Sequence, residues 1–325
     1  MPLLELTASG LYCAEGDFYI DPWAPAERVI LTHAHAAGAH RSTSYLTSKA
    51  GEPLLRAALG PDAKIESIEY GVPLTPGGVR VSLHPSGHIL GSAQVRIEHG
   101  GEIWVVSGHY KLASDPTCAP FDPLRCHTLI TEASYGLPIF RWRGENEIRA
   151  AIHAWWAGNR ETGRSSLLFA HPVGKAQRLL ALLDPAAGPI YCHPAVESIN
   201  AIYRQRGIAL APTALAEGDR DWRRALVLAP PSTHGSAWAR RFAPASTAMA
   251  SGWMRIRGTR RRRSLDRGFT FSDHADWPGS LRALDEIGAE RVWVTGRFRG
   301  PLARWIEEHG GSASAIEGQW EEAEQ

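Results

Sequence analysis

The sequence predicts an α/β protein in which a second unit is inserted into the first. Its 325 residues exceed the length of one ordinary domain. Short apolar runs separated by Gly, Pro and Asp turns occupy residues 20–132, whereas longer helical patterns alternate with buried strands from residue 146 onward. No repeat and no low-complexity linker separates the two regions, so we expect an insertion rather than a tandem arrangement.

The first region reads as strands with loops at their ends. The expected strands lie within residues 28–35, 78–84, 93–99, 102–109 and 127–136. A helix is expected at residues 51–60, between the first two of these strands. Histidines follow several of the strands directly, and strand ends are rigid places on which to build a site.

The second region alternates helices with buried strands, which predicts a parallel βαβ sheet. The expected helices lie at residues 147–159, 175–184 and 196–207, and the strands at 165–172, 188–194 and 224–231. A hairpin-like, arginine-rich segment at residues 253–267 leads into a last strand, helix and strand over residues 269–296. The acidic tail, residues 318–325, is expected to fray.

The composition is that of a compact globular chain, because 44% of the residues are hydrophobic and 21% are charged. No basic stretch precedes an apolar run near the start, and no stretch of about 18 apolar residues occurs anywhere. We therefore expect neither a signal peptide nor a membrane span, and a cytoplasmic protein. The four cysteines form no CxxC pair, so we expect them to be reduced and structural.

Histidines carry the strongest local signal. His33 and His35 form an HxH at the end of an expected strand, where two imidazoles can converge on one ion. His88, in a glycine-flanked turn, is the candidate third ligand, and His109 and His274 are the fourth and fifth. Taken singly, each is as well explained as a surface or core-edge residue. The set as a whole favours a metal site.

Several motifs of the sequence together resemble those of a known family. LTHAH, SGHILGSAQVRIE, VVSG, ITEASYG and SDHADW, in this order, are similar to the metallo-β-lactamase fold nucleases that contain an inserted β-CASP domain. Among these, the sequence resembles the bacterial ligase-associated DNA exonucleases, which occur beside an ATP-dependent DNA ligase and a helicase. The likeness runs from residue 9 to residue 308. It implies a metallo-β-lactamase αββα domain from residues 1–140 and 270–325, and a β-CASP domain from residues 141–269.

The resemblance also assigns roles to individual residues. His33, His35 and His88 match the three ligands of one metal of the family's two. Glu132 and His274 match the pair that performs acid–base chemistry near the scissile phosphate.

Four positions depart from the family's ligand pattern. Ala37 and Gly38 stand where the motif His-x-His-x-Asp-His has Asp and His. His109 replaces the aspartate that bridges both metals, and Gly296 replaces a late histidine. A two-metal site is therefore not expected. The remaining imidazoles suit one Zn²⁺, with Mn²⁺ as the alternative. His109 is either a fourth ligand, which would close the site, or a close neighbour.

Arginines dominate the segment between residues 255 and 267, with Asp266 as the only acid. The arginines are Arg255, Arg257, Arg260, Arg261, Arg262, Arg263 and Arg267. A charge run is usually a solvated face, but this one lacks compensating acids, and the family layout would place it along the cleft between the domains. We expect it to bind nucleic-acid phosphates with a steep salt dependence. Lys175, which opens a helix after a strand, is a further candidate phosphate ligand.

Three functions are compatible with these features. The first is a metal-dependent DNA nuclease that trims single-stranded or 3′-terminal DNA in repair, beside a DNA ligase and a helicase. The second is a catalytically inactive relative that binds nucleic acid, which the four departures favour. The third is a mononuclear hydrolase of a small ester or lactone.

Overall fold

The computed structural model describes residues 2–37, 41–218 and 220–318, so Gly38 and nearly all of the acidic tail lie outside the described residues. The chain forms two compact units. Residues up to Ile139 together with residues from His274 onward form the first unit, and Phe140–Asp273 form the second. No helix within the described ranges is long and apolar enough to cross a membrane.

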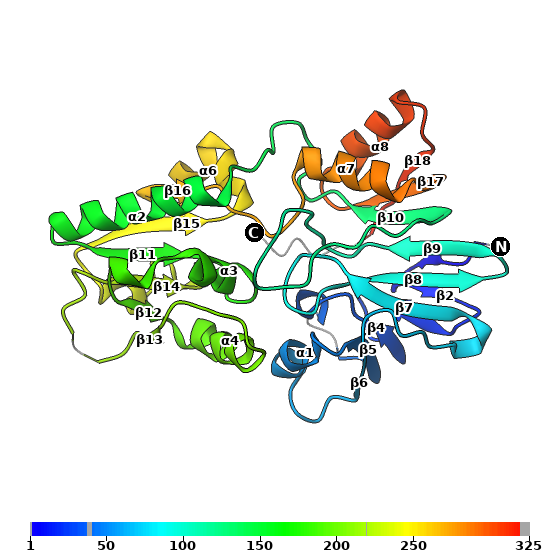
Figure 1. Cartoon of the computed structure of the whole chain (residues 1–325), viewed down its shortest axis with the longest axis horizontal. Helices are drawn as coiled ribbons and strands as arrows, with labels where there is room; N and C mark the ends of the chain where they lie inside the picture. Colours follow the sequence, from blue (N-terminus) through cyan, green and yellow to red (C-terminus); the bar gives the residue numbers. More distant parts are fainter. Residues whose placement is uncertain (1, 38–40, 219, 319–325) are drawn as a thin grey trace. The chain divides into compact units, whose positions relative to one another are not determined.

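Two six-stranded sheets form the first unit (Figure 1). The first sheet, in spatial order, contains β1 (Glu5–Thr7), β2 (Gly10–Cys13), β3 (Phe18–Ile20), β4 (Arg28–Ile30), β5 (Ser44–Ser48) and β6 (Ile65–Ile68). The second contains β18 (Ala313–Ala315), β17 (Arg291–Thr295), β10 (Thr128–Glu132), β9 (Glu102–Val106), β8 (Ala93–His99) and β7 (Arg80–Pro85). In each sheet one half is an antiparallel meander and the other half is parallel.

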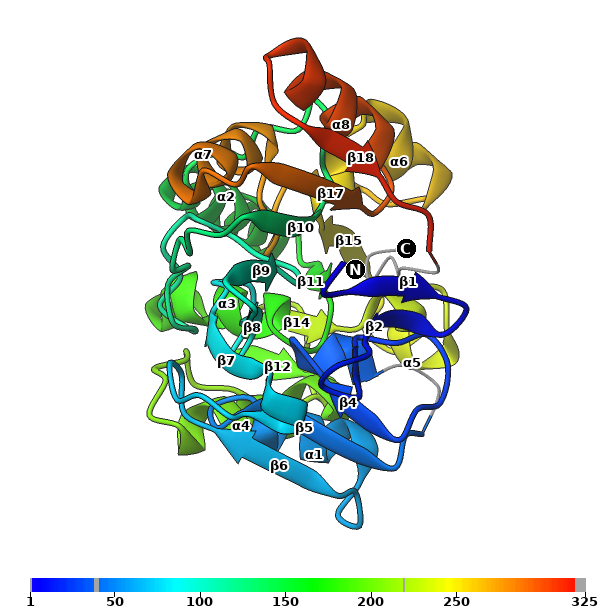
Figure 2. The same ribbon diagram turned by 90° about the vertical axis from the view of Figure 1, so that its right-hand side faces the viewer.

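The inner faces of these two sheets share one apolar core. Leu11 and Ile20 of the first sheet belong to the same buried cluster as Val95, Val106 and Ile130 of the second. The outer faces are covered by helices. Helix α1 (Glu52–Leu59) packs on the first sheet, and α7 (Trp277–Ile287) and α8 (Arg299–Glu308) pack on the second, where Figure 2 shows α8 beside β17 and β18. This is the αββα sandwich that the resemblance implies.

The second unit is a parallel sheet covered on both faces, as the alternating pattern predicts. Its strands, in spatial order, are β13 (Ala214–Leu215), β12 (Ile190–Cys192), β14 (Leu226–Ala229), β11 (Ser165–Phe169), β15 (Ala245–Ala250) and β16 (Arg267–Phe269). Its helices are α2 (Glu145–Glu161), α3 (Lys175–Leu182), α4 (Pro194–Gln205), α5 (Ala237–Arg240) and α6 (Arg257–Arg262). Separate apolar clusters pack on the two faces of this sheet. The unit is the inserted α/β domain.

Short 3₁₀ turns occur between these elements. They are η1 (Ala34–Ala37), η2 (Pro76–Gly78), η3 (Pro185–Ala187), η4 (Pro231–Thr233) and η5 (Gly252–Arg255). The first of them, η1, contains the second histidine of the HxH motif, so it determines where that imidazole lies.

Candidate metal centre

Strand ends of the first unit bring the predicted site residues together. The residues are His33, His35, His88, His109, Glu132 and His274. The HxH motif follows β4, and Glu132 is the last residue of β10. His88 lies in the β7–β8 loop, His109 follows β9, and His274 precedes α7. Six residues from five separate parts of the sequence therefore lie close together.

A chain of hydrogen bonds fixes the His33 ring. Both the backbone N–H and the hydroxyl of Thr32 donate to the Asp21 carboxylate, at 2.9 and 2.6 Å. Because the hydroxyl proton is used there, the Thr32 oxygen accepts a hydrogen bond from Nδ1–H of His33 at 2.7 Å. Nδ1 of His33 therefore carries the proton, and Nε2 keeps its lone pair.

That Nε2 atom of His33 is buried and has no hydrogen-bond partner in the part of the chain that the structure describes. Burial, together with the neighbouring histidines, lowers the pKa of His33 well below its usual value, so the ring is neutral. A buried polar atom without a partner is costly unless something binds it. A neutral imidazole with a free lone pair is what a transition metal requires.

Asp21 and Thr32 support the candidate ligand His33 through hydrogen bonds, and neither was identified from the sequence. Burial raises the pKa of Asp21, and the two hydrogen bonds from Thr32 oppose this effect in part. The resulting pKa is about 6. The pair orients His33 as an outer group orients a metal ligand. The available sequence signal was a threonine placed directly before the HxH motif, at the end of an apolar strand.

Gly108 allows the turn that bears His109 to approach Thr32. Its φ is +56°, and a Cβ at this position would lie 2.7 Å from both Cβ and Oγ1 of Thr32. Any other residue would combine left-handed strain with a steric clash. Glycine is therefore required for the His33 and His109 rings to lie 4.5 Å apart.

One group of three imidazoles has the geometry of a metal site. Ligand nitrogens of His33, His35 and His88 all lie within 4.8 Å of one another. Nε2 of His88 and Nδ1 of His35 are 3.3 Å apart, close to the roughly 3.3 Å between ligands of a tetrahedral ion with bonds of about 2.0–2.1 Å. Together with the unpartnered Nε2 of His33, this donor set fits a divalent transition metal.

A second group shares one residue with the first. Ligand nitrogens of His88, His109 and His274 also lie within 4.8 Å of one another. Glu132 accepts a hydrogen bond from Nδ1 of His274 at 2.9 Å and another from the backbone N–H of Ser134 at 2.7 Å. Burial would raise the pKa of Glu132, but His274 and these hydrogen bonds lower it to about 2, so the carboxylate is ionised.

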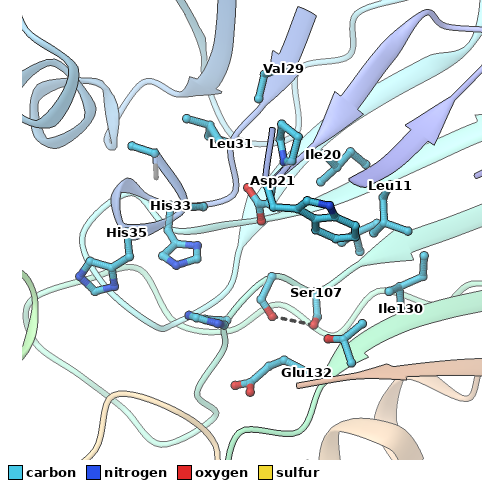
Figure 3. Close-up of a pocket in the computed structure, with 18 of the residues that line it drawn as sticks. Leu11, Ile20, Asp21, Val29, Leu31, His33, His35, Ser107, Ile130 and Glu132 are labelled. Atoms are coloured by element: carbon cyan, nitrogen blue, oxygen red, sulfur yellow. Dashed lines mark hydrogen bonds between the residues drawn. The ribbon is translucent and has the colours of Figure 1, made fainter. Parts of the chain in front are cut away.

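Two of the four positions that depart from the family pattern, Ala37 and Gly296, have no side chain that could bind a metal. Ala37, in η1, and Gly296, after β17, line a cavity of about 380 Å³ beside the histidines. Figure 3 shows His33 and His35 at one end of this pocket and Leu11, Ile20 and Ile130 at the other. Apolar space therefore occupies part of the site.

The arginine-rich segment is helical, and its prediction as a hairpin is wrong. It forms η5 and the short helix α6, because Ser251 caps the first turn and arginine is a good helix former. Arg255, Arg260, Arg261 and Arg262 are exposed, and Arg263 is half-buried. Within the described ranges, Arg260–Arg263 form no ion pair, and the acid of the segment, Asp266, pairs with Arg164.

The environment of Lys175 does not fit its prediction as a phosphate ligand. Its side chain is 2% exposed, and Nζ lies 3.4 Å from the carboxylate of Asp273. The N-terminus of α3 is also occupied, because the Gln177 side chain accepts a hydrogen bond from the backbone N–H of Gly174. Sequence position alone does not show whether a lysine at a helix start faces solvent or an internal acid.

Comparison with known proteins gives a consistent picture. No protein-family model matches the chain. A "Probable DNA ligase" of Opitutus terrae is 31% identical over 97% of this chain, which corresponds to 31% of that protein. "Endoribonuclease YSH1" of Yarrowia lipolytica is 32% identical, and "Cleavage and polyadenylation specificity factor subunit 3" of Dictyostelium discoideum is 30% identical. Each match covers 37% of this chain and 15% or 16% of the relative.

The chain thus spans about a third or less of the curated relatives that it matches. A solved structure, titled "Crystal Structure of a Protein of Unknown Function from Enterococcus faecalis V583", superposes with a TM-score of 0.61. The superposition covers 90% of this chain and 80% of that one, at 11% identity, so it shows likeness of fold alone.

Proposed function

Because this chain belongs to the metallo-β-lactamase/β-CASP nuclease family, we propose that it is a metal-dependent nuclease acting on DNA. Its substrate would be single-stranded or 3′-terminal DNA, and its context DNA repair beside an ATP-dependent DNA ligase and a helicase. The relative from Opitutus terrae that is named a probable DNA ligase supports this context.

The observation that carries the proposal is the hydrogen-bond chain from Asp21 through Thr32 to His33. It leaves Nε2 of His33 buried and without a partner among the described residues, beside the nitrogens of His35 and His88. A bound ion would satisfy this buried atom, and a metal-dependent nuclease requires such an ion. Zn²⁺ is the ion that three neutral imidazoles favour.

The chain's own residues have distinct roles in this proposal. His33, His35 and His88 would hold the ion, which when bound supplies Lewis acidity at a phosphoryl oxygen. Glu132 fixes the ring of His274 through Nδ1, so Nε2 of His274 has a lone pair that can accept a proton. The exposed arginines of the second unit would bind the phosphate backbone.

A digestion assay tests the proposal. Chelator-treated protein is incubated with end-labelled single-stranded DNA, or RNA of the same sequence, with Zn²⁺ or Mn²⁺ added. We expect digestion of DNA that His88→Ala abolishes and that His99→Ala, at an exposed histidine that ends β8, leaves unchanged. Digestion that persists in His88→Ala would overturn the proposed site. Salt-sensitive DNA binding without digestion would establish the inactive, DNA-binding alternative.

The cavity favours a second candidate, a hydrolase of a small organic ester or lactone. About 380 Å³ of partly apolar space beside the histidines is enough for a small organic molecule. Aryl ester and lactone substrates, assayed with the same variants, distinguish the two. Turnover of these compounds without digestion of nucleic acid would favour the second candidate.

A further inference from the structure

The family's ligand pattern does not predict that the rings of His109 and His274 lie together. An aspartate stands in that pattern where this chain has His109. Here the His109 ring lies 4.5 Å from that of His274 and 5.2 Å from that of His88, and the rings of His88 and His274 are 4.7 Å apart. One nitrogen from each ring lies within 4.8 Å of the others. This triangle is as tight as the one formed by His33, His35 and His88.

The backbone holds this second triangle rigidly. The carbonyl of Tyr110 accepts a hydrogen bond from the N–H of Ala275 at 2.7 Å. Each of these residues directly follows one of the two histidines, so the bond fixes the β9 end against the segment that enters α7. Tyr110 and His274 are both nearly fully buried, at 2% and 3% exposure. Little reorganisation is needed to bring the two rings onto one ion.

Glu132 prepares His274 as a ligand. One oxygen of the carboxylate accepts the Nδ1 proton of His274 and the other accepts the N–H of Ser134, so both oxygens are engaged. Metal-bound histidines typically donate their other ring N–H to a carboxylate in this way. With Nδ1 bonded to Glu132, Nε2 is the atom through which His274 would bind a cation in this group.

We propose that His88, His109 and His274 form a second seat for a divalent transition-metal ion, with Glu132 as its outer carboxylate. The seat shares His88 with the first group. A neutral imidazole binds one cation through one nitrogen, and no carboxylate among the described residues of the two groups bridges them. The two seats are alternatives, and the chain binds one ion at a time. With an ion in the second seat, His274 binds the cation and does not move a proton.

Metal stoichiometry tests this proposal without reference to nuclease activity. Full-length protein is titrated with Co²⁺ and Zn²⁺, and the visible absorption of Co²⁺ reports a low-coordinate site. We expect one ion per chain in the double variant His33→Ala/His35→Ala, and also in the matched variant His109→Ala/His274→Ala. We expect none in the quadruple variant. A His33→Ala/His35→Ala protein with native circular dichroism and no bound ion would overturn the proposal.

If the His33→Ala/His35→Ala protein does not fold, a milder pair of variants tests the same proposal. His35 is half-buried, so we expect His35→Ala to leave the fold intact and to reduce the first group to two ligands. In this background Glu132→Gln should lower Zn²⁺ affinity about 10–100-fold, because only the second seat depends on Glu132. In the His109→Ala/His274→Ala background the same change should have no effect. Equal effects of Glu132→Gln in both backgrounds would overturn the proposal.

Discussion

The histidine centre of the first unit and the arginine segment of the second differ in how their side chains are held. The centre consists of largely buried side chains, of which His33 and His274 are held by hydrogen bonds to Thr32 and Glu132. The arginine segment consists of charged, largely exposed side chains on a short helix. Metal binding by the histidine centre should depend on atomic positions to within a fraction of an ångström. DNA binding by the arginine segment should depend on the number of charges. Substitutions at the two places break each dependence separately.

The largest effect is expected from Gly108→Ala. Its Cβ would lie 2.7 Å from Thr32 in a left-handed conformation, so we expect a loss of roughly 2–4 kcal/mol in the free energy of unfolding. Urea denaturation measures it. Gly100→Ala is the matched control, because Gly100 has φ +57° but no atom within 4 Å of its Cβ position. It should cost only about 1 kcal/mol. Equal losses would show that the approach to Thr32 is not tight.

A pH-dependent effect of up to about 3 kcal/mol is expected at Asp21. Because its folded pKa is raised from 3.8 to about 6, protonation favours the folded state, and stability is lost as pH rises from about 4 to 6. Asp21→Asn should remove this loss in metal-free protein. The difference between wild type and variant, from thermal unfolding at several pH values, isolates it from the histidines. Asp285→Asn, at an exposed position of α7, should show no such difference.

Thr32→Val should lower Zn²⁺ affinity about 10–100-fold, measured by competition with a chromophoric chelator. The change keeps the shape of the side chain but removes the hydroxyl that fixes the His33 tautomer. Thr47→Val is the control, because Thr47 is also buried and its hydroxyl makes only a 3.4 Å contact with a backbone carbonyl. Unchanged affinity in Thr32→Val would show that Asp21 and Thr32 do not support the metal site.

The smallest effect is expected from a single arginine. Arg261→Gln should reduce the slope of log affinity for DNA against log salt by about 1, because one phosphate contact is lost. Fluorescence anisotropy at several salt concentrations measures the slope. Arg223→Gln, which removes an exposed arginine paired with Asp221, should leave it unchanged. Equal slopes for both variants would mean that α6 does not contact DNA.

Sequence patterns predict most of the fold and part of the site. Periodicity locates α1, the three long helices α2, α4 and α7, and the strands of the parallel sheet, because one buried face determines each of them. The HxH motif at a strand end predicts where two imidazoles lie. Pattern alone did not predict that Lys175 is buried against Asp273, that the arginine segment is helical, or that Asp21 bonds to Thr32. These features depend on contacts between residues far apart in sequence or on local capping.

The proton positions at His33 determine how ion binding is coupled to the solvent. The Nδ1 proton is held by Thr32, and the lowered pKa leaves the ring neutral at pH 7. An ion that binds Nε2 therefore displaces no proton from this ligand. Any protons released on binding, measured by titration calorimetry in buffers of low and high ionisation enthalpy, should therefore come from groups other than His33. The hydrogen bond to Thr32 thus lets His33 bind a cation without giving up a proton to bulk water.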